Sequence, residues 1–324
     1  MNRRLLQAAW ILAIVLLMAA TAAYAKSPLN MYWKDGIRFE SEDGNFKFKF
    51  GGRIMADWVF WADWDDKLIE AIGELEDGTE FRRARLYVSG EIYKHVEFKA
   101  QYDFGGGDTD FKDVYLGLKK IPTIGGVRVG HFKEPFSLEE LTSSKYITFM
   151  ERSLPSCFWP SRNTGIMVHN HAMEERLTWA VGVFKDADDF GGQQESGKFN
   201  ITGRLTGLPV CTDDGEKLVH VGIGYSHRAP NEDTVRYRQR PEVHLSPRFV
   251  DTKSIHDVDS VDVIDGELAC VFGPFSVQGE YTQAMLSLDN GSDDPDFSGW
   301  YAMGSWFLTG EHRRYKNSAG CFDR

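Results

Sequence analysis

The sequence beyond residue 25 lacks any long hydrophobic run. No apolar stretch there reaches the ~20 residues that a helix needs to cross a bilayer. The first 25 residues differ, because Arg3 and Arg4 precede an apolar run over 5–20 and small residues at Ala23 and Ala25. This order is typical of a secretory signal peptide, and its cleavage pattern near Ala25 disfavours an uncleaved signal anchor. We therefore expect an exported chain in which any membrane crossing uses strands.

Cysteines are few, and the common motifs of catalysis are missing. The 4 cysteines are widely spaced and form no Cys-x-x-Cys pair of the kind that binds metals or exchanges disulfides. The sequence contains no Ser-His-Asp set, phosphate-binding loop or dinucleotide fingerprint. His169 and His171 share a strand face, but two histidines without a third ligand are a weak signal for a metal. We expect no catalytic residue, no metal and no cofactor.

A basic surplus is also lacking. The formal net charge is -11 at pH 7, which disfavours nucleic acid as a partner. Net charge says little about a pore, because acids can lie in loops while bases lie inside. The length of 324 residues suits one large β domain as well as two smaller domains.

What the sequence has is strict alternation, clearest from Phe81 to Phe104. Apolar residues hold one face of both arms, and a period of two predicts strands. The opposite face carries full charges in mid-strand, as in a membrane barrel whose polar face lines a wet lumen and whose apolar face meets lipid. That polar face comprises Arg83, Arg85, Tyr87, Ser89, Glu91, Glu97, Lys99, Gln101 and Asp103. A soluble sandwich also alternates, so a soluble secreted β-rich ligand-binding protein is an alternative.

Alternation elsewhere predicts about twelve strands from Phe46 onward, joined by connections of two lengths. Those near residues 94, 124, 174, 210 and 273 are short or moderate, and those near 70, 144, 190, 242 and 292 tend to be longer. Outer-membrane barrels pair short periplasmic turns with longer outer loops. We predict open sheet edges at 297–309 and 46–60. The expected domains are a signal peptide (1–25), a lead-in (26–44), an incomplete antiparallel transmembrane β-barrel (45–310) and a truncated tail (311–324).

Several motifs resemble the phosphate-selective porin O/P family. They are Asp43-Gly44-Asn45 before Gly51-Gly52-Arg53, then segments 81–85, 112–117, 130–137, 143–144, 149–152, 240–242 and 301–311. The resemblance covers nearly the whole mature chain. It implies a trimeric barrel of about sixteen strands in the lipid of a Gram-negative outer membrane, about four more strands than the sequence supplies. It also implies passage of small inorganic anions, phosphate or polyphosphate among them, through a pore narrowed by an inward-folded third loop.

Two departures from the family pattern bear on selectivity. Arg85 stands where phosphate-selective members often have an aromatic residue, and Glu139-Glu140 stand where a phosphate-selecting lysine is expected. A general diffusion porin without phosphate preference is therefore an alternative. An outer-membrane hydrolase is another, but it would need a lipid-facing serine beside a histidine, and the lipid-facing residues are apolar.

Bases on the lumen-facing phase are the candidate anion pathway. A cationic lining lowers the cost of bringing an anion into a narrow pore, and a guanidinium can hold an oxyanion through two hydrogen bonds. The strand candidates are Lys47, Arg53, Arg82, Arg83, Arg85, Lys99, Asp113 and Arg204. The same phase predicts outward Phe48, Ile54, Trp58, Leu86, Phe98 and Leu205. The alternative for any one base is an ion pair across the barrel wall.

The long connection 133–163 supplies further candidates. We expect it to fold into the barrel with Ser143, Ser144 and Arg152 facing the pore, opposite Arg83 and Arg85. Lys133 and Lys145 could add donors for an oxyanion, and we expect Asp113 to pair with Arg152 and hold the loop against the wall. The alternative is that these residues only fix the loop in place.

A second long connection, 228–261, carries arginines at every second residue, Arg236, Arg238 and Arg240. In an extended segment they would stack ~6.6 Å apart and could pass an anion from one to the next. The alternative is an exposed loop edge guarded by charge.

Overall fold

The computed structural model describes residues 28–62, 66–291 and 293–324, so the expected signal peptide lies outside the described residues. A single antiparallel sheet of 14 strands dominates the fold, with its strands paired in chain order, and the predicted all-β class is confirmed. The strands are β1 (Leu29–Trp33), β2 (Ile37–Ser41), β3 (Phe46–Val59), β4 (Gly78–Ile92), β5 (Val96–Asp103), β6 (Asp110–Ile121), β7 (Gly125–Lys133), β8 (Arg162–Ala172), β9 (Leu177–Lys185), β10 (Asn200–Cys211), β11 (Lys217–Arg228), β14 (Val258–Phe272), β15 (Phe275–Leu288) and β16 (Asp296–Trp306).

The connections alternate in length as predicted. At one end of the sheet they are tight. Tyr93 and Lys94, with φ of 52° and 62°, reverse the chain between β4 and β5, and consecutive positive φ values suit a type I′ hairpin turn. At the other end the connection between β5 and β6 is short, whereas three longer connections carry their own structure. They contain α2 (Asp66–Ile72), α3 (Leu138–Leu141) with the 3-10 turn η1 (Leu154–Cys157), and η2 (Asn231–Asp233) with the short strands β12 (Arg238–Gln239) and β13 (Val250–Asp251). None of the helices within the described ranges is long and apolar enough to span a membrane.

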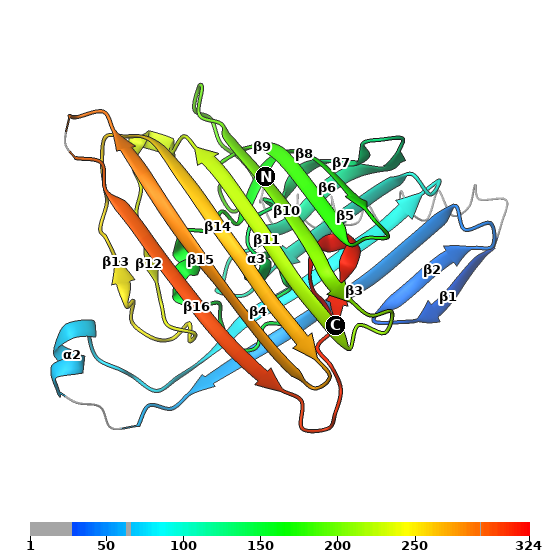
Figure 1. Ribbon diagram of the computed structural model, residues 1–324, viewed down its shortest axis with the longest axis horizontal. Coiled ribbons are helices and arrows are strands. Elements are labelled where there is room, and N and C mark those ends of the chain that lie inside the picture. The colour runs from blue at the N-terminus through cyan, green and yellow to red at the C-terminus, as the bar shows by residue number, and fades with distance from the viewer. Residues whose placement is uncertain (1–27, 63–65, 292) are drawn as a thin grey trace, which may run out of the picture.

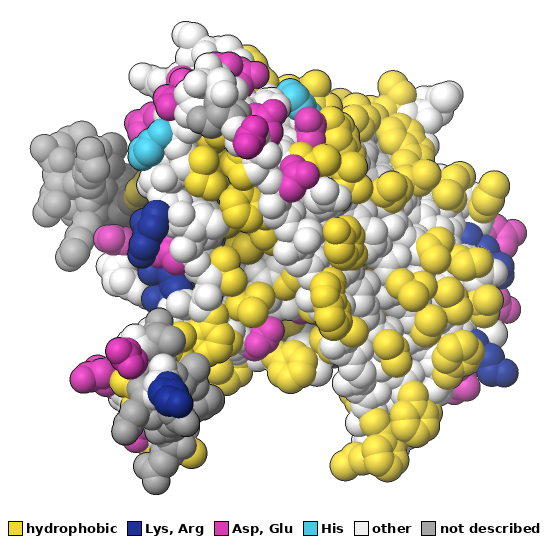
Figure 2. Space-filling model, turned by 60° about the vertical axis from the view of Figure 1, so that its left-hand side comes forward, with side chains coloured by type: hydrophobic (Ala, Val, Ile, Leu, Met, Phe, Trp, Pro, Cys, Tyr) yellow, Lys and Arg dark blue, Asp and Glu magenta, His cyan; other side chains and the backbone are white. Residues whose placement is uncertain are grey.

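The two faces of the strands differ as the alternation requires. Arg83 is 2% exposed, whereas its neighbours on the other face, Ile54 and Leu86, are 76% and 62% exposed. Figure 2 shows hydrophobic side chains spread over much of the visible surface, with acidic side chains mostly toward its margins. Exposed apolar side chains on this scale suit a surface that faces lipid.

The sheet bends so that two parts of it face each other across an interior (Figure 1). Strands β14, β15 and β16 lie in front and β3 to β8 behind, with α3 and the C-terminal segment between them. We call the connection between β7 and β8, residues 134–161, the inner loop, and residues 307–324 the tail. The tail forms β17 (Tyr315–Lys316), the turn η3 (Asn317–Ala319) and β18 (Cys321–Phe322).

Two apolar clusters lie on the inner surface of β14 and β15. In the first, Phe136 and Trp159 of the inner loop pack with Val263 and Ala284. In the second, Phe322 of the tail is buried with Val271 and other residues. We call β14 and β15 the covered wall, because the inner loop and the tail keep water from much of its inner face.

The predicted sheet edges are half right. Strand β16 ends the sheet order, as predicted, but β3 does not, because β2 pairs with its residues 47–50 and β1 pairs with β2. Two strands of five residues each are too short for a clear alternation. The sheet therefore begins at Leu29, within the segment expected to be a lead-in.

Candidate functional site

The inner loop leaves and rejoins the sheet at one narrow point. The Glu134 backbone N–H donates to the Ser161 carbonyl over 3.0 Å, and Lys133 is paired with Arg162 across β7 and β8. Between these ends, Ser137 caps α3 by accepting from the Glu140 backbone N–H over 3.1 Å. The loop is thus closed at its neck and starts with a short helical turn inside the molecule.

One side of the inner loop is attached to the covered wall. Backbone N–H groups of Leu138 and Glu139 donate to the two carboxylate oxygens of Glu280 at 2.8 and 2.9 Å. The Trp159 indole N–H donates to Thr282 Oγ1 over 2.7 Å. Both acceptors lie on β15.

The other side is attached to β3 and β4. Glu151 accepts from Arg82 Nε at 2.7 Å and from Arg83 Nη2 at 2.9 and 2.7 Å. Arg53 Nη2 donates to Ser144 Oγ at 2.8 Å and its Nη1 lies 3.4 Å from Ser143 Oγ. The inner loop therefore crosses the interior and divides it, as the sequence predicted for 133–163.

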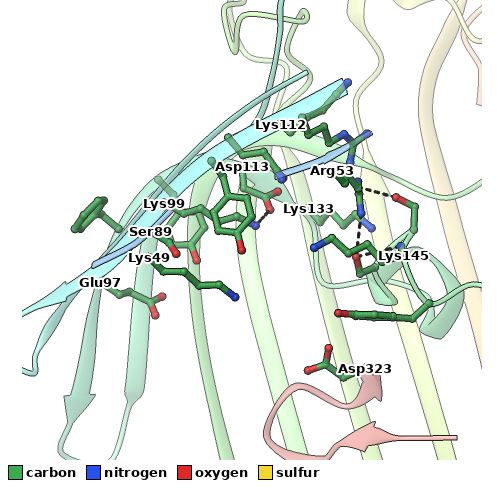
Figure 3. A pocket seen from close by; sticks show the side chains of 18 of the residues that line it. Lys49, Arg53, Ser89, Glu97, Lys99, Lys112, Asp113, Lys133, Lys145 and Asp323 are labelled. Atoms are coloured by element: carbon green, nitrogen blue, oxygen red, sulfur yellow. Dashed lines mark hydrogen bonds and ion pairs between the residues drawn. The ribbon is translucent and has the colours of Figure 1, made fainter. Parts of the chain in front are cut away.

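A cavity of about 810 Å³ lies between the inner loop and the wall formed by β3 to β6, which we call the cavity wall. Figure 3 shows Lys49, Arg53, Lys99, Lys133 and Lys145 around this space. The strand and loop candidates that line it are Lys47, Arg53, Arg82, Arg83, Arg85, Lys99, Asp113, Lys133, Ser143, Ser144 and Arg152.

Most of the bases lining this cavity are neutralised by acids. Arg85 Nε lies 2.5 Å from Asp103, and Lys99 Nζ lies 2.5 Å from Asp113. The remaining pairs are Lys47 with Glu40, Arg82 and Arg83 with Glu151, Lys112 with Asp110, Lys133 and Arg152 with Glu140, and Arg162 with Asp113. For these bases the ion-pair alternative holds, and their net field in the cavity is weak.

Five bases that line the cavity make no ion pair in the part of the chain that the structure describes: Arg38, Lys49, Arg53, Lys145 and Lys316. Three of them, Lys49, Arg53 and Lys145, lie on β3 or on the inner loop. Arg53 is held only by the two serine hydroxyls, and its Nε is buried without a hydrogen-bond partner. Lys49 lies over the Tyr87 ring, 5.7 Å from its centre. Positive charge is therefore concentrated where β3 faces the inner loop.

Burial perturbs the charges of the inner loop itself. Burial lowers the pKa of Lys145, and the nearby Arg53 lowers it further. Burial opposes ionisation of Glu151 as well, but Arg82 and Arg83 outweigh it and lower the pKa of Glu151. The inner loop thus carries a base, Lys145, whose charge is disfavoured by burial, and an acid, Glu151, whose charge is favoured by two arginines.

The two acids Glu139 and Glu140 are both buried, yet their pKa values shift in opposite directions. Burial raises the pKa of Glu139, whose carboxylate accepts from the Ser153 backbone N–H and hydroxyl. Burial also disfavours the charge of Glu140, but Arg152 and Lys133 outweigh it and lower the pKa of Glu140. Glu140 consequently adds little negative field to the cavity.

Asp113 does not pair with Arg152, contrary to the sequence prediction. Its partners are Arg162, with Nε 2.8 Å from Oδ1, and Lys99. Arg152 instead lies 3.0 Å from Glu140 and donates to the carbonyls of residues 139, 140 and 142. The prediction failed because Arg162, at the start of β8, is fixed by strand pairing beside β7, whereas Arg152 is drawn to the carbonyl end of α3.

The other candidates lie outside this cavity. Arg204 donates to both carboxylate oxygens of Glu267 at 2.7 and 2.6 Å and lines a second space of about 590 Å³. Arg236 is exposed and held by both oxygens of Asp251, and Arg238 is exposed in β12. Arg240 donates to the Ser246 carbonyl and lines a small space beside the inner loop. The three arginines of the second connection thus do not form one continuous ladder.

The sequence singled out too few residues at this site. Glu151 and Arg162 organise its charges, and Tyr146 lines it. A signal existed for Arg162, because it follows Pro160 where alternation resumes. No pattern in the sequence distinguishes Glu151 from the other acids of the inner loop.

Comparison with known proteins places this chain among porins. The family described as phosphate-selective porin O and P matches residues 48–321. Porin O of Pseudomonas aeruginosa is 29% identical over 327 residues, which covers 90% of this chain and 70% of that protein. An uncharacterized protein of Caulobacter vibrioides is 29% identical over 314 residues, which covers 93% of this chain and 60% of that protein.

Solved structures agree on the fold. The anion-selective porin from Comamonas acidovorans superposes with a TM-score of 0.51 at 16% identity, covering 81% of this chain and 75% of that one. OmpT of Vibrio cholerae, an outer membrane protein, gives 0.50 at 13% identity, covering 83% and 79%. With a family match over most of the chain, an antiparallel sheet with a lipid-facing surface and an inner loop, the chain belongs to the phosphate-selective porin O and P family and is an outer-membrane β-barrel porin.

Proposed function

We propose that this porin passes small inorganic anions through the cavity beside the inner loop. The observation that carries the proposal is the concentration of unneutralised bases there, Lys49, Arg53 and Lys145, in a chain whose formal net charge is -11. The anion-selective character of the Comamonas porin and the family name support the same direction.

The chemistry of Arg53 suits transient anion binding. Its guanidinium is already desolvated, lies near the like charges of Arg83 and Arg85, and lacks an acidic partner among the described residues. A dehydrated anion would compensate that charge. It would accept hydrogen bonds from the guanidinium and from the Ser143 and Ser144 hydroxyls. Because two neutral hydroxyls and one cation bind less strongly than a closed cage of cations, the ion can also leave, as conduction requires.

We infer little preference for phosphate over other small anions. Lys133 and Arg152 both form ion pairs with Glu140, so neither base is available to a multiply charged oxyanion. A general diffusion porin without phosphate preference is the limiting case of this inference. Chloride current measured with and without added phosphate distinguishes a phosphate-preferring pore from one without that preference. A strong phosphate site would block chloride at low phosphate concentration.

Assembly and boundaries are part of the same proposal. We infer a homotrimer embedded in outer-membrane lipid, with no enzymatic step, on the strength of family membership. The boundaries at residues 25 and 310 remain predictions. Chemical crosslinking of the purified protein in detergent tests the trimer, since a trimer gives a ladder that ends at three chains.

Arg53→Ala is the decisive variant for anion passage. We expect a lower ratio of anion to cation permeability, measured as the reversal potential of planar bilayers under a KCl gradient. Arg53→Lys should keep most of the selectivity. Lys47→Ala is the matched control on the same strand, because Lys47 is already neutralised by Glu40 at 2.8 Å. An unchanged reversal potential in Arg53→Ala would remove this residue from the pathway.

Arg83 and Arg85 are poorer test positions than the sequence suggested. Replacing both by Ala would leave Asp103 without its basic partner and Glu151 with Arg82 alone. Removing one member of a buried ion pair costs about 3–5 kcal/mol, so any change in current would mix selectivity with stability.

A further inference from the structure

Three acidic side chains meet on the covered wall, away from the cavity of the proposed anion pathway. Asp265 and Glu267 lie on β14 and Glu280 on β15. They are 0%, 5% and 3% exposed, and one oxygen of each lies within 4.8 Å of the others. Three buried carboxylates at this separation repel one another strongly unless positive charge compensates them.

Glu267 has its own compensation. Both of its oxygens accept from Arg204, and His220 Nε2 lies 2.8 Å from Oε2. The other ring nitrogen of His220 is 2.6 Å from the Tyr315 hydroxyl, so the histidine offers no nitrogen to a metal. One charge of the three is therefore balanced.

Asp265 and Glu280 have no such balance. Neither makes an ion pair with any base in the described part of the chain. Asp265 Oδ1 accepts from the Thr282 hydroxyl over 2.5 Å, and its Oδ2 is buried with no hydrogen-bond partner. Glu280 accepts from the Tyr301 hydroxyl over 2.5 Å and from two backbone N–H groups of the inner loop. Two buried carboxyl groups thus face each other without a base between them, and one oxygen lacks any donor.

We propose that Asp265, Glu267 and Glu280 bind one hard divalent cation of the calcium class. A charge of two matches the two uncompensated carboxylates, and a proton shared between them would leave one charge unbalanced. Ligand oxygens about 2.4 Å from a central ion lie at most about 4.8 Å apart, which agrees with the spacing here.

The donor set selects among metals. All three donors are carboxylate oxygens, which suit calcium, magnesium or manganese rather than zinc or copper. Calcium tolerates irregular, incomplete protein coordination better than magnesium, which demands near-octahedral geometry. Each carboxylate also retains a lone pair, because an oxygen accepts two hydrogen bonds and Glu267 Oε1 and Glu280 Oε2 each accept one.

The position of the site gives it a mechanical role. Glu280 holds the start of α3 through two backbone N–H groups, and Thr282 links Asp265 to the Trp159 indole. A cation at this point would fix both the beginning and the end of the inner loop to the covered wall. It would do so without touching the bases of the proposed anion pathway.

Terbium luminescence tests the site directly, because Tb³⁺ replaces calcium and is excited through a neighbouring indole. Trp159 is one hydrogen bond from Thr282, which in turn contacts Asp265. We expect sensitised Tb³⁺ emission from the purified full chain in detergent, displaced by CaCl₂. Asp265→Asn should abolish the displaceable emission and lower bound calcium by about one ion per chain in equilibrium dialysis.

Asp259→Asn is the matched control, since Asp259 is exposed on the same strand. It should bind calcium as the wild type does. Equal calcium binding by wild type and Asp265→Asn overturns the proposal and favours a proton shared between Asp265 and Glu280. If Asp265→Asn fails to fold, Trp159→Phe decides, because it leaves every ligand in place. That variant should lose the emission yet retain the calcium, and unchanged emission would contradict the assignment.

Discussion

The cavity wall and the covered wall belong to one sheet, yet their inner faces obey different rules. On β3 to β6 the inner face is charged and borders an open cavity with Arg53 and Lys49. On β14 and β15 the inner face holds Val263, Ala284 and a buried carboxylate cluster beneath the inner loop. The difference shows that a position facing the lumen is not necessarily a position facing water.

This comparison separates the residues that stabilise the protein from those that tune its pore. Substitutions on the covered wall remove buried contacts, so their main effect falls on stability. Substitutions at unpaired bases of the cavity wall alter the field along the pathway, so their main effect falls on selectivity.

The largest effect should come from Phe136→Ala, at the contact between the inner loop and the covered wall. Phe136 is 0% exposed and packs in the cluster between the inner loop and the covered wall. Truncating a buried phenylalanine costs about 3–5 kcal/mol. We expect a clearly lower thermal unfolding midpoint in detergent and noisier single-channel current. Phe149→Ala, in the same loop but 54% exposed, should change little. Equal destabilisation by both variants would show that packing against the covered wall does not stabilise the inner loop.

Acidification should have an intermediate effect, because it weakens the contact of the inner loop with the cavity wall. The pKa of Glu151 is lowered in the folded protein from its ordinary value of 4.5, because Arg82 and Arg83 outweigh burial. The stabilisation from this contact is therefore complete above about pH 4.5 and is lost as pH falls through the lowered value. We expect larger current fluctuations as the bath falls from pH 7 toward pH 3.

Two further acids bear on the same titration. Glu140, with a lowered pKa, adds to the loss on acidification, whereas Glu139, with a raised pKa, opposes it. Glu151→Gln removes one titrating contact and should show a weaker pH dependence, with noise already raised at pH 7. Fluctuations that are independent of pH in the wild type would exclude this contact as the loop anchor.

The smallest effect should come from Ser144→Ala. Its hydroxyl accepts from Arg53 over 2.8 Å, and a hydrogen bond to a charged group contributes about 1.5–3 kcal/mol, less where water replaces it. We expect a modest shift in reversal potential, below that of Arg53→Ala. Ser143→Ala, whose contact is 3.4 Å long, should shift it less still. A larger effect from Ser143→Ala than from Ser144→Ala would mean that the hydrogen bond to Arg53 does not decide how much each hydroxyl contributes to selectivity.

Much of the sheet could be predicted from the sequence, because alternation directly reports strands and faces. The hairpin from Phe81 to Phe104 shows this, since β4 and β5 pair with Arg85 opposite Asp103. The inner loop was also predictable, because a long segment without alternation between two strands must be accommodated somewhere. Long-range partners were not predictable, because they depend on how the loop folds.

Asp113 and the tail illustrate what alternation leaves out. Asp113 was expected beside Arg152, but strand pairing places Arg162 there. In the tail, the Gly320 carbonyl accepts from Arg204 and Phe322 is 1% exposed, and alternation predicts neither contact. Both cases depend on contacts between segments far apart in sequence, and a period of two carries no information about them.

The closed neck of the inner loop has an evolutionary consequence. Glu134 and Ser161 are joined by a backbone hydrogen bond, and the adjoining pairing of Lys133 with Arg162 continues the strand register on both sides. Mutations, insertions or whole replacements between these two residues would therefore leave the pairing of β7 and β8 intact. The strand register at the neck thus sets no limit on the length of the loop, whereas the packing of the loop against the covered wall constrains its sequence.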